Sequence, residues 1–371
     1  MKFGNAISFF KSIVSQENLY PPIIFGKRKM GVDIGDLFKK EEITFDDLHE
    51  RIVSIDAYNV LHQFLATIRQ PDGTPLKDAR GETTSHLSGL FYRTANLVES
   101  KIRPIYVFDG EPHPLKAKTL EERMKRKELA EKAWKEAIEA GDMEKARTKA
   151  QQTSRVTDEI IEQSIELLDA LGIPHIQAPS EGEAQASYMV RKGSAYAVGS
   201  QDYDCLLFGS PILVRNLTSS EKRKLPKKQA YVPITPHIIR LQPNLKTLEI
   251  SHEQLVDMAI LIGTDFNDGI RGYGPKKSLS LIKKTGNIEK ALPEIKSDNI
   301  PTSDEIKQIR EIFLNPATTD DYTLNWSTPD KDKVLKILCD KHQFTKDRVE
   351  PILEKFSSIE NIKKQKNLFD F

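Results

Sequence analysis

"SAYAVGSQDYD", residues 194–204, sets a short apolar run directly before two aspartates. The run has the length of a buried strand, and a further apolar stretch, residues 205–208, follows Asp202 and Asp204. Two carboxylates at the edge of a core repel each other and lose hydration, so they need a partner that offsets both costs. The alternative is a simple turn that uses the two aspartates locally.

The same pattern of an apolar strand followed by an acid occurs twice earlier. "RIVSIDAYN", residues 51–59, leads to Asp56, and "RPIYVFDGE", residues 103–111, leads to Asp109. Apolar runs of this kind, rich in Val, Ile and Tyr, are typical of parallel strands that are covered on both faces. The sequence therefore predicts neighbouring parallel strands in these segments.

Helical patterns lie between the predicted strands. Residues 83–100 and 157–174 both show helical spacing of apolar residues, and Gly172 and Pro174 are stop signals for the second. The alternation predicts an α/β fold with a mostly parallel, twisted central sheet flanked by helices. After residue 251 the pattern is wholly helical.

The three acids that end strands are expected to meet. In an open α/β sheet, ligands bind beyond the carboxyl ends of the strands. Asp56, Asp109 and Asp202 all lie at such ends. Taken singly, Asp56 or Asp109 could equally be an ordinary turn acid at the end of a strand.

Other carboxylates share this theme. "PSEGEAQAS", residues 179–187, contains Glu181 and Glu183, and "LIGTDF" places Asp265 at the end of an apolar helix. Taken alone, Ser180 and Glu183 form the pattern of a capping box. Only the set as a whole favours a common site.

Seven converging carboxylates would need cations. Two charges about 5 Å apart repel by roughly 3 kcal/mol at an effective dielectric near 20. Oxygen-only ligands select Mg²⁺ or Mn²⁺ over zinc. Two such ions per site activate a water and stabilise both oxygens of a phosphodiester under attack. The acids therefore predict a two-metal site for phosphodiester hydrolysis, with Mg²⁺ as the cofactor and Mn²⁺ as a substitute.

Five motifs carry a resemblance to a known family. "VFDGEPHPLK", "APSEGEAQAS", "SQDYDCLLFGS", "LIGTDF" and "GIRGYGPKKS" occur in this order. From Met30 onward the chain resembles the flap endonucleases, and its short tail is similar to the archaeal branch. The resemblance implies a structure-specific 5′ flap endonuclease with 5′→3′ exonuclease activity, acting in Okazaki fragment maturation and long-patch base excision repair. The metal-binding acids that it implies are Asp56, Asp109, Glu181, Glu183, Asp202, Asp204 and Asp265.

The resemblance also assigns roles to a charged segment, residues 111–155. Alone, this segment reads as solvated helix that projects from the core. By resemblance it is the helical arch through which a 5′ flap passes, and Lys116 and Arg123 are catalytic residues that contact the scissile phosphate. His62 stands where the family usually has a base-stacking tyrosine, so we assign it a weak stacking role.

A glycine-rich turn is the second nucleic-acid feature. "GIRGYGPKKS" could be an ordinary turn between helices, but glycines let backbone N–H groups approach phosphates. By resemblance it is a helix-hairpin-helix that grips duplex DNA, with K⁺ as a further ion. The DNA-binding residues expected across the chain are Arg69, Arg93, Glu181, Asp265, Gly269, Gly272, Gly274, Lys276 and Lys277.

The two ends of the chain carry separate expectations. Gln365, Leu368 and Phe371 in "QKNLFDF" resemble the motif that binds the sliding clamp (PCNA); a frayed terminus is the alternative. Residues 1–29 have no counterpart in the family pattern. We expect the native protein to start at Met30, with a targeting role as the less favoured reading.

Bulk properties set further limits. Lys plus Arg is 55 and Asp plus Glu is 54, so net charge does not identify a partner. The only cysteines, Cys205 and Cys339, fit a reducing cytoplasm, and no stretch is apolar enough for a membrane span. We expect a cytoplasmic, nucleoid-associated protein, monomeric away from the clamp, that acts on 5′ flap, nicked or gapped duplex DNA.

The predicted division of the chain follows the motifs. An N-terminal extension precedes two parts of the nuclease core, a helix-hairpin-helix region and the tail: residues 1–29, 30–130, 131–265, 266–360 and 361–371. Two rivals stay open: a related nuclease that cuts gaps, bubbles or junctions, and a non-catalytic DNA-junction adaptor on the clamp. A missing metal acid would favour the adaptor.

Overall fold

The computed structural model describes residues 32–219, 222–224, 231–297 and 299–356 of the 371-residue chain. Within these ranges a seven-stranded sheet has the order β1-β9-β6-β5-β2-β3-β4. In that order the strands are β1 (Glu41–Glu42), β9 (His237–Arg240), β6 (Ile212–Arg215), β5 (Ala197–Gly199), β2 (Ile52–Asp56), β3 (Arg103–Phe108) and β4 (His175–Gln177). A separate two-stranded ribbon pairs β7 (Lys222–Lys224) with β8 (Tyr231–Pro233).

The predicted strands are confirmed as neighbours in the sheet. The strand β2 pairs in parallel with β3 on one side and with β5 on the other. Asp56 lies opposite Val107, and Ile55 lies opposite Gly199. This register brings the carboxyl ends of the three strands to one edge. Only β9 and β1 run antiparallel to their neighbours, so the sheet is mostly parallel as predicted.

Helices cover both faces of the sheet. On one face α2 (Ala57–Thr67) and α3 (Ser85–Glu99) pack on β3, and α6 (Asp158–Leu171) packs on α3. On the other face α7 (Gly182–Arg191) packs on β2, β3 and β5, followed by α8 (Asp204–Leu207). The predicted helices at 83–100 and 157–174 are α3 and α6. Gly172 closes α6 with a φ of 67°, a left-handed conformation that glycine adopts without strain.

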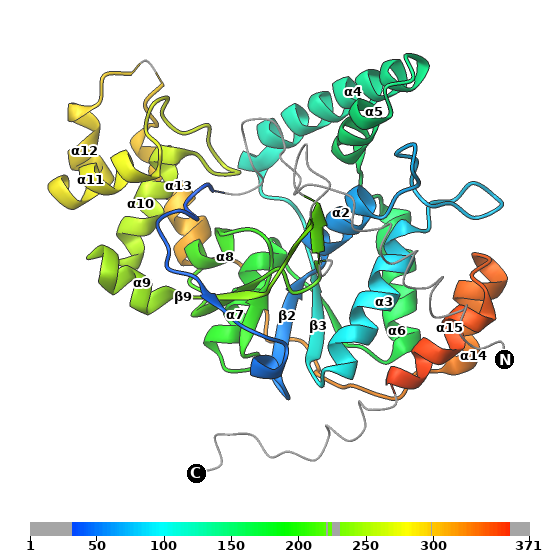
Figure 1. Ribbon diagram of the computed structural model, residues 1–371. Coiled ribbons are helices and arrows are strands. Elements are labelled where there is room, and N and C mark those ends of the chain that lie inside the picture. The colour runs from blue at the N-terminus through cyan, green and yellow to red at the C-terminus, as the bar shows by residue number, and fades with distance from the viewer. Residues whose placement is uncertain (1–31, 220–221, 225–230, 298, 357–371) are drawn as a thin grey trace, which may run out of the picture.

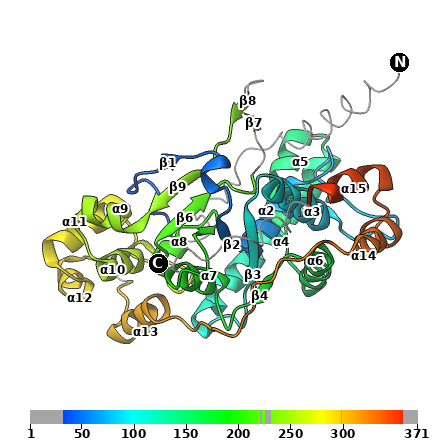
Figure 2. The same ribbon diagram turned by 90° about the horizontal axis from the view of Figure 1, so that it is seen from below.

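The described chain after residue 251 contains helices as its regular elements, as predicted. Figure 2 shows α9 (Leu241–Leu248) and the group α10 to α13 at one end of the sheet, and α14 and α15 at the other. An extended segment between α13 and α14 joins the two ends. The bounds are α10 (His252–Ile262), α11 (Pro275–Thr285), α12 (Ile288–Ala291), α13 (Ser303–Leu314), α14 (Lys331–Leu335), the π-helix η5 (Lys336–Lys341) and α15 (Lys346–Leu353).

The charged segment projects as a helical pair, as predicted (Figure 1). It consists of α4 (Ala117–Glu139) and α5 (Met143–Ala150), which pack on each other and follow the short helix η2 (Pro114–Lys116). Ala130 and Ala137 are the only buried residues of α4, so the helix is solvated over most of its length. The Trp134 ring N–H donates to the Asp72 carbonyl at 3.2 Å and ties the pair to the loop after α2.

None of the helices in the described ranges is long and apolar enough to cross a membrane. The division of the chain into the five predicted parts stays a prediction. Residues 1–29 and the tail at 361–371 lie outside the described ranges.

Candidate active site

Asp56 and Asp109 stand at the ends of the two central strands. Asp56 caps α2, where its Oδ1 accepts the Asn59 N–H at 3.0 Å. The other oxygen of Asp56 lies 3.4 Å from the Ser200 hydroxyl. Asp109 Oδ1 accepts the Gly182 N–H at 2.6 Å and so ties the end of β3 to the first turn of α7. Asp56 is therefore a local cap and a member of a larger cluster at once.

The capping box that the sequence allows at the start of α7 does not form. The Ser180 hydroxyl donates to the Glu111 carbonyl at 3.1 Å, and Glu181 occupies the N-cap position without a side-chain capping bond. Glu183 Oε1 instead accepts from the Ser200 hydroxyl at 3.0 Å and from the Cys205 thiol at 3.3 Å. Glu183 thus faces the ends of the strands and not the end of its own helix.

Asp202 and Asp204 are held by distant parts of the chain. Asp202 Oδ2 accepts from the Asn59 side-chain amide at 2.9 Å, and Asp204 Oδ1 accepts the Val32 N–H at 2.7 Å. These partners lie 143 and 172 positions away in sequence. Long-range contacts therefore fix the pair, and the simple local turn does not account for it.

The base of the helical pair reaches the acids from outside the sheet. Asp265 follows α10, and its carboxylate pairs with the Arg123 guanidinium of α4. The Lys116 ammonium contacts Glu181 and lies 3.8 Å from Asp265 Oδ2. Both predicted basic residues therefore lie against predicted metal acids.

Burial dominates the electrostatics of the cluster. Burial, with the charge of Asp109, raises the pKa of Asp56 to about 7. Burial, with the charge of Asp265, raises the pKa of Asp204 to about 7. Burial also raises the pKa of Asp109 to about 6, although the Lys116 charge opposes the shift. These carboxylates are expensive to ionise together without further positive charge.

The remaining acids complete one connected group. Burial and the charge of Asp56 raise the pKa of Glu183 well above its usual value, and burial and Asp204 do the same for Asp202. Glu181 raises the pKa of Asp109. The structure thus brings all seven predicted acids together at one edge of the sheet. Their donors are carboxylate oxygens, which suit hard divalent cations such as Mg²⁺.

A second acidic cluster lies elsewhere and was not predicted. In the loop before α3, Asp78 lies beside His342, whose Nδ1 is 3.1 Å from Asp78 Oδ2. Arg80 Nη2 lies 3.1 Å from Asp78 and 3.0 Å from Glu82. The arginine pairs with both acids and also donates to the Lys341 carbonyl, so this cluster joins the loop to the chain at the end of η5.

The glycine-rich turn lies between α10 and α11, as expected for a helix-hairpin-helix. Gly269 and Gly272 have φ values of 69° and 85°, and Gly274 caps α11. Nothing lies within 4 Å of a side chain built at Gly272 or Gly274, so the backbone is open to a ligand. Lys277 Nζ lies 3.8 Å from the centre of the Tyr273 ring. Contacts of this turn, Lys276 included, with DNA stay a prediction.

The other predicted DNA contacts differ in exposure. Arg69 is only 8% exposed and donates to the Leu65 and Gly73 carbonyls at 2.7 and 2.8 Å, so it braces the loop after α2. Arg93 is half-buried on α3. A contact of either arginine with DNA stays a prediction.

His62 lies on α2 beneath the base of α4. Burial, then the charges of Lys127 and Arg123, lowers the pKa of His62 to about 3. Its imidazole is therefore neutral at physiological pH. The stacking role itself stays a prediction.

Sequence reasoning missed the residues that position the acids. Ser200 joins Asp56 and Glu183, and Asn59 joins Asp202 to α2. Both lie inside quoted motifs, one position before "QDYD" and three after Asp56. The signal that could have found these two residues is a polar side chain close to the end of an apolar strand. The clamp-motif residues Gln365, Leu368 and Phe371 lie outside the described residues.

Comparisons with known proteins agree with this geometry. Residues 30–130 match the XPG N-terminal domain and residues 172–265 match the XPG I-region. Flap endonuclease 1 of Archaeoglobus fulgidus is 50% identical over 332 residues, which are 90% of this chain and 97% of that protein. Flap endonuclease 1 of Aeropyrum pernix is 52% identical over 88% of this chain and 94% of that protein.

Solved structures show the same likeness. The flap endonuclease-1 structure from Methanococcus jannaschii has a TM-score of 0.70 and 42% identity, and the match covers 89% of this chain and 99% of that one. The catalytic core of Rad2 in complex with DNA substrate has a TM-score of 0.63, but at 23% identity it shows the fold alone.

The XPG regions and the acidic edge of the sheet together define a structure-specific nuclease of the XPG superfamily, a hydrolase of DNA. Within that class, the chain belongs to the flap endonuclease family, in its archaeal type. This family is metal-dependent and serves DNA replication and repair.

Proposed function

We propose that this protein cuts DNA at the base of a 5′ flap by hydrolysis that depends on two Mg²⁺ ions, with Mn²⁺ as a substitute. One observation carries the proposal. Seven carboxylates meet at one edge of the sheet, burial raises the pKa of five of them, and within the described residues Lys116 and Arg123 are the cations that form ion pairs with the group. The residual negative charge and the oxygen-only donor set fit divalent cations.

The bound ions would supply an activated water and stabilise the oxygens of the scissile phosphodiester. The chain's own residues prepare that site. Ser200 and Asn59 hold Asp56, Glu183 and Asp202 in place through hydrogen bonds of 2.9 to 3.4 Å. Because these bonds come from the end of β5 and from α2, they restrict how far the acids can move.

Lys116 and Arg123 act on the phosphate in this proposal. Without DNA they neutralise Glu181 and Asp265. The acids would hold the ions, and with the ions bound Lys116 and Arg123 would be free to contact the phosphate and stabilise the charge that develops on it. The cut leaves a 5′-phosphate and a 3′-hydroxyl.

We propose a DNA path that the placement of the elements around the acids supports. The single-stranded flap passes beneath α4 and α5, whose base carries Lys116 and Arg123. The duplex lies along the turn between α10 and α11, where the open backbone of Gly272 and Gly274 suits phosphates and a K⁺ ion. His62 stacks on the base next to the scissile phosphate.

One assay tests the core of the proposal. A double-flap substrate is compared with nicked duplex, plain single strand and plain duplex, each with Mg²⁺ and with EDTA. We expect Mg²⁺-dependent cutting at the flap junction, slower 5′→3′ trimming of the nicked duplex, and no cutting in EDTA. Equal cutting of gaps, bubbles or four-way junctions would favour the related nucleases instead.

The partner proposal concerns the tail and rests on sequence alone. Gln365, Leu368 and Phe371 fit a peptide that binds the sliding clamp. Deleting residues 365–371 should abolish stimulation by the clamp and leave clamp-free cutting unchanged. Stimulation that survives the deletion would refute the motif. The protein is proposed to work as a monomer away from the clamp, in the cytoplasm at the nucleoid.

A further inference from the structure

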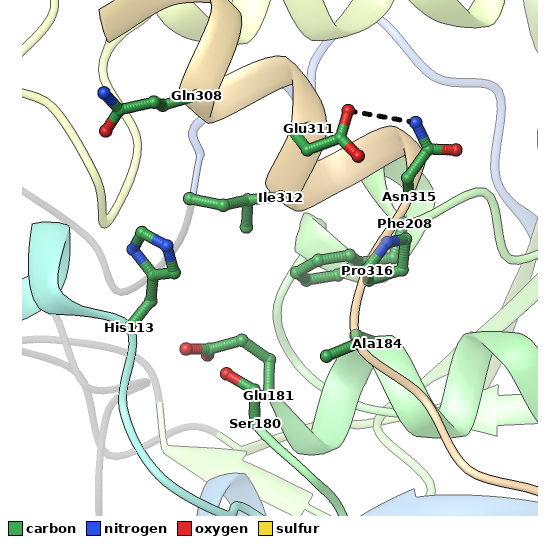
Figure 3. Close-up of a pocket in the computed structure, with 11 residues that line it drawn as sticks. His113, Ser180, Glu181, Ala184, Phe208, Gln308, Glu311, Ile312, Asn315 and Pro316 are labelled. Atoms are coloured by element: carbon green, nitrogen blue, oxygen red, sulfur yellow. Dashed lines mark hydrogen bonds between the residues drawn. The ribbon is translucent and has the colours of Figure 1, made fainter.

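A cavity of about 250 Å³ opens beside the acids, between α13 and the segment that leads into α7 (Figure 3). His113 stands on one side of it, Ser180 and Glu181 lie below, and α13 lies above. Further lining residues are Ala184, Phe208, Gln308, Glu311, Ile312, Asn315, Pro316 and Ala317. None of the functions described so far uses this space.

The side chains that line the cavity suit a small planar ring. Ile312 and Pro316 give it an apolar wall together with the largely buried Phe208, the His113 ring stands at one side, and the amides of Gln308 and Asn315 stand at its rim. Pockets for drug-sized ligands measure roughly 300 to 1,000 Å³. The smaller volume here suits a single heterocycle such as a nucleobase.

The charge of the lining favours a base over a phosphate as the occupant of the cavity. Glu181 and Glu311 both line the cavity, and Glu311 Oε2 accepts from the Asn315 amide at 3.1 Å. Two carboxylates repel a phosphate but accept hydrogen bonds from the exocyclic amino groups of adenine, cytosine and guanine. The cavity therefore favours an uncharged base over a free nucleotide.

The cavity is continuous with the acid cluster. Glu181 lines the cavity and also contacts Lys116. The His113 ring stands edge-on to Phe266, with centroids 6.1 Å apart, and Phe266 directly follows Asp265. A strand whose phosphate lies at the acids thus has its neighbouring nucleotide beside the cavity.

We propose that this cavity receives one base of the single-stranded flap, on the other side of the cleaved bond from the base that stacks on His62, and so selects which phosphate reaches the acids. The proposal rests on the proposed flap cleavage and adds a base-binding subsite to it. Stacking on aromatic and apolar side chains tolerates any base, and the carboxylates weaken binding of thymine, which lacks an exocyclic amino group.

The test is a scan of double-flap substrates in which each of the first four flap nucleotides is replaced in turn by an abasic site. For the unaltered protein with Mg²⁺, one position should lower kcat/KM about tenfold and spread the cuts over neighbouring bonds. Ile312→Trp fills the cavity, so this variant should show the spread cuts with intact DNA and no further loss at the abasic position. Asn315 is exposed at the entrance of the cavity, so Asn315→Trp should block it and have the same effect as Ile312→Trp.

Lys307→Trp is the matched control, because Lys307 is exposed on the same helix and does not line the cavity. It should retain the abasic effect of the unaltered protein. The subsite would be overturned if no flap position were sensitive to an abasic site. It would also be overturned if Ile312→Trp and Asn315→Trp kept the sensitive position of the unaltered protein. Inhibition by free dAMP without any abasic effect would assign the cavity to a nucleotide and also overturn it. Absence of any flap cleavage by the unaltered protein would instead reject the function itself.

Discussion

Within the described residues, the acids at the sheet edge and those in the loop before α3 differ in how their charge is balanced. At the edge of the sheet, burial raises the pKa values of Asp56 and Asp204 to about 7. In the loop before α3, burial also acts on Asp78, but the Glu82 N–H, Arg80 and His342 outweigh it and lower the pKa of Asp78 to about 2. The acids at the sheet edge lack enough partners to stabilise their ionised forms, whereas Asp78 has such partners.

This difference distinguishes a cluster that suits a metal site from a cluster that stabilises the fold. A cluster whose hydrogen bonds and ion pairs already stabilise the ionised form gains little from a cation. A cluster whose acids stay costly to ionise stores unfavourable energy that a bound metal relieves, and such sites trade stability for activity. In the loop cluster, ligand atoms of Asp78, Glu82 and His342 lie within 4.8 Å of one another, yet Arg80 already pairs with both acids.

The largest effect is expected from Asp202→Asn. Loss of this carboxylate should lower the single-turnover cleavage rate at least a thousandfold, because it removes a ligand without removing phosphate contacts. Binding of flap DNA, measured by fluorescence anisotropy, should stay within about threefold. In EDTA the variant should melt at a higher temperature than the unaltered protein, since one source of repulsion is gone.

Asp268→Asn serves as the control for this variant. Asp268 is three residues from Asp265 and contacts the exposed Lys118 of α4. It should cleave at nearly the normal rate and show no rise in melting temperature in EDTA. Near-normal cleavage by Asp202→Asn would reject the metal assignment.

The next effect concerns the two cations. Lys116→Ala and Arg123→Ala should each slow single-turnover cleavage about a hundredfold, because each removes charge that stabilises the transition state. Affinity for flap DNA should fall much less. Lys118→Ala, on the same segment but 70% exposed, should change the rate less than threefold. Equal losses of affinity and rate would show that the two residues only hold DNA.

Much of the fold could be predicted because its signals are local. Each of the three predicted strands is short and leads to an acid, and α6 carries both its Thr157 cap and its Gly172 stop signal. Parallel strands then align their carboxyl ends, so convergence of Asp56, Asp109 and Asp202 follows from topology. Asp265 is grouped with them because it ends an apolar helix, a position that gives no comparable register.

The remaining features depend on contacts between distant segments. No local pattern shows that Ser180 turns to Glu111 and leaves Glu183 free for the site. The loop cluster combines Asp78 with His342, which lies 264 positions away. Arg69 has a charge typical of a DNA contact, yet the fold uses its donors on backbone carbonyls. Burial decides these cases, and burial is not visible in the spacing of residues.

The pH dependence of stability should have opposite signs in the two clusters. For Asp56 and Asp204, the folded pKa of about 7 lies above the ordinary value of 3.8, so the folded state binds more protons between these limits. Metal-free stability should therefore fall as pH rises from about 4 to about 7, by on the order of a few kcal/mol. Urea unfolding in EDTA measures this change.

Mg²⁺ should reverse that loss, because it binds only the folded site. Asp202→Asn should flatten the metal-free slope between pH 5 and 7. A slope that is the same with and without Mg²⁺, and the same in the variant, would mean that the acids at the sheet edge do not control it.

The smallest effect is expected from Asp78→Asn, which breaks the balanced cluster. The folded pKa of Asp78 is lowered to about 2, so its stabilising contribution is present above about pH 4 and is lost as pH falls toward 2. The variant should melt a few degrees lower at pH 7, and the gap should close at acidic pH. Cleavage per folded molecule should not change, since Asp78 lies in the loop that Arg80 and His342 hold to the chain after η5. If Mg²⁺ raised the melting temperature of the unaltered protein but not of Asp78→Asn, the loop cluster would be a metal site, and the contrast between the two clusters would fail.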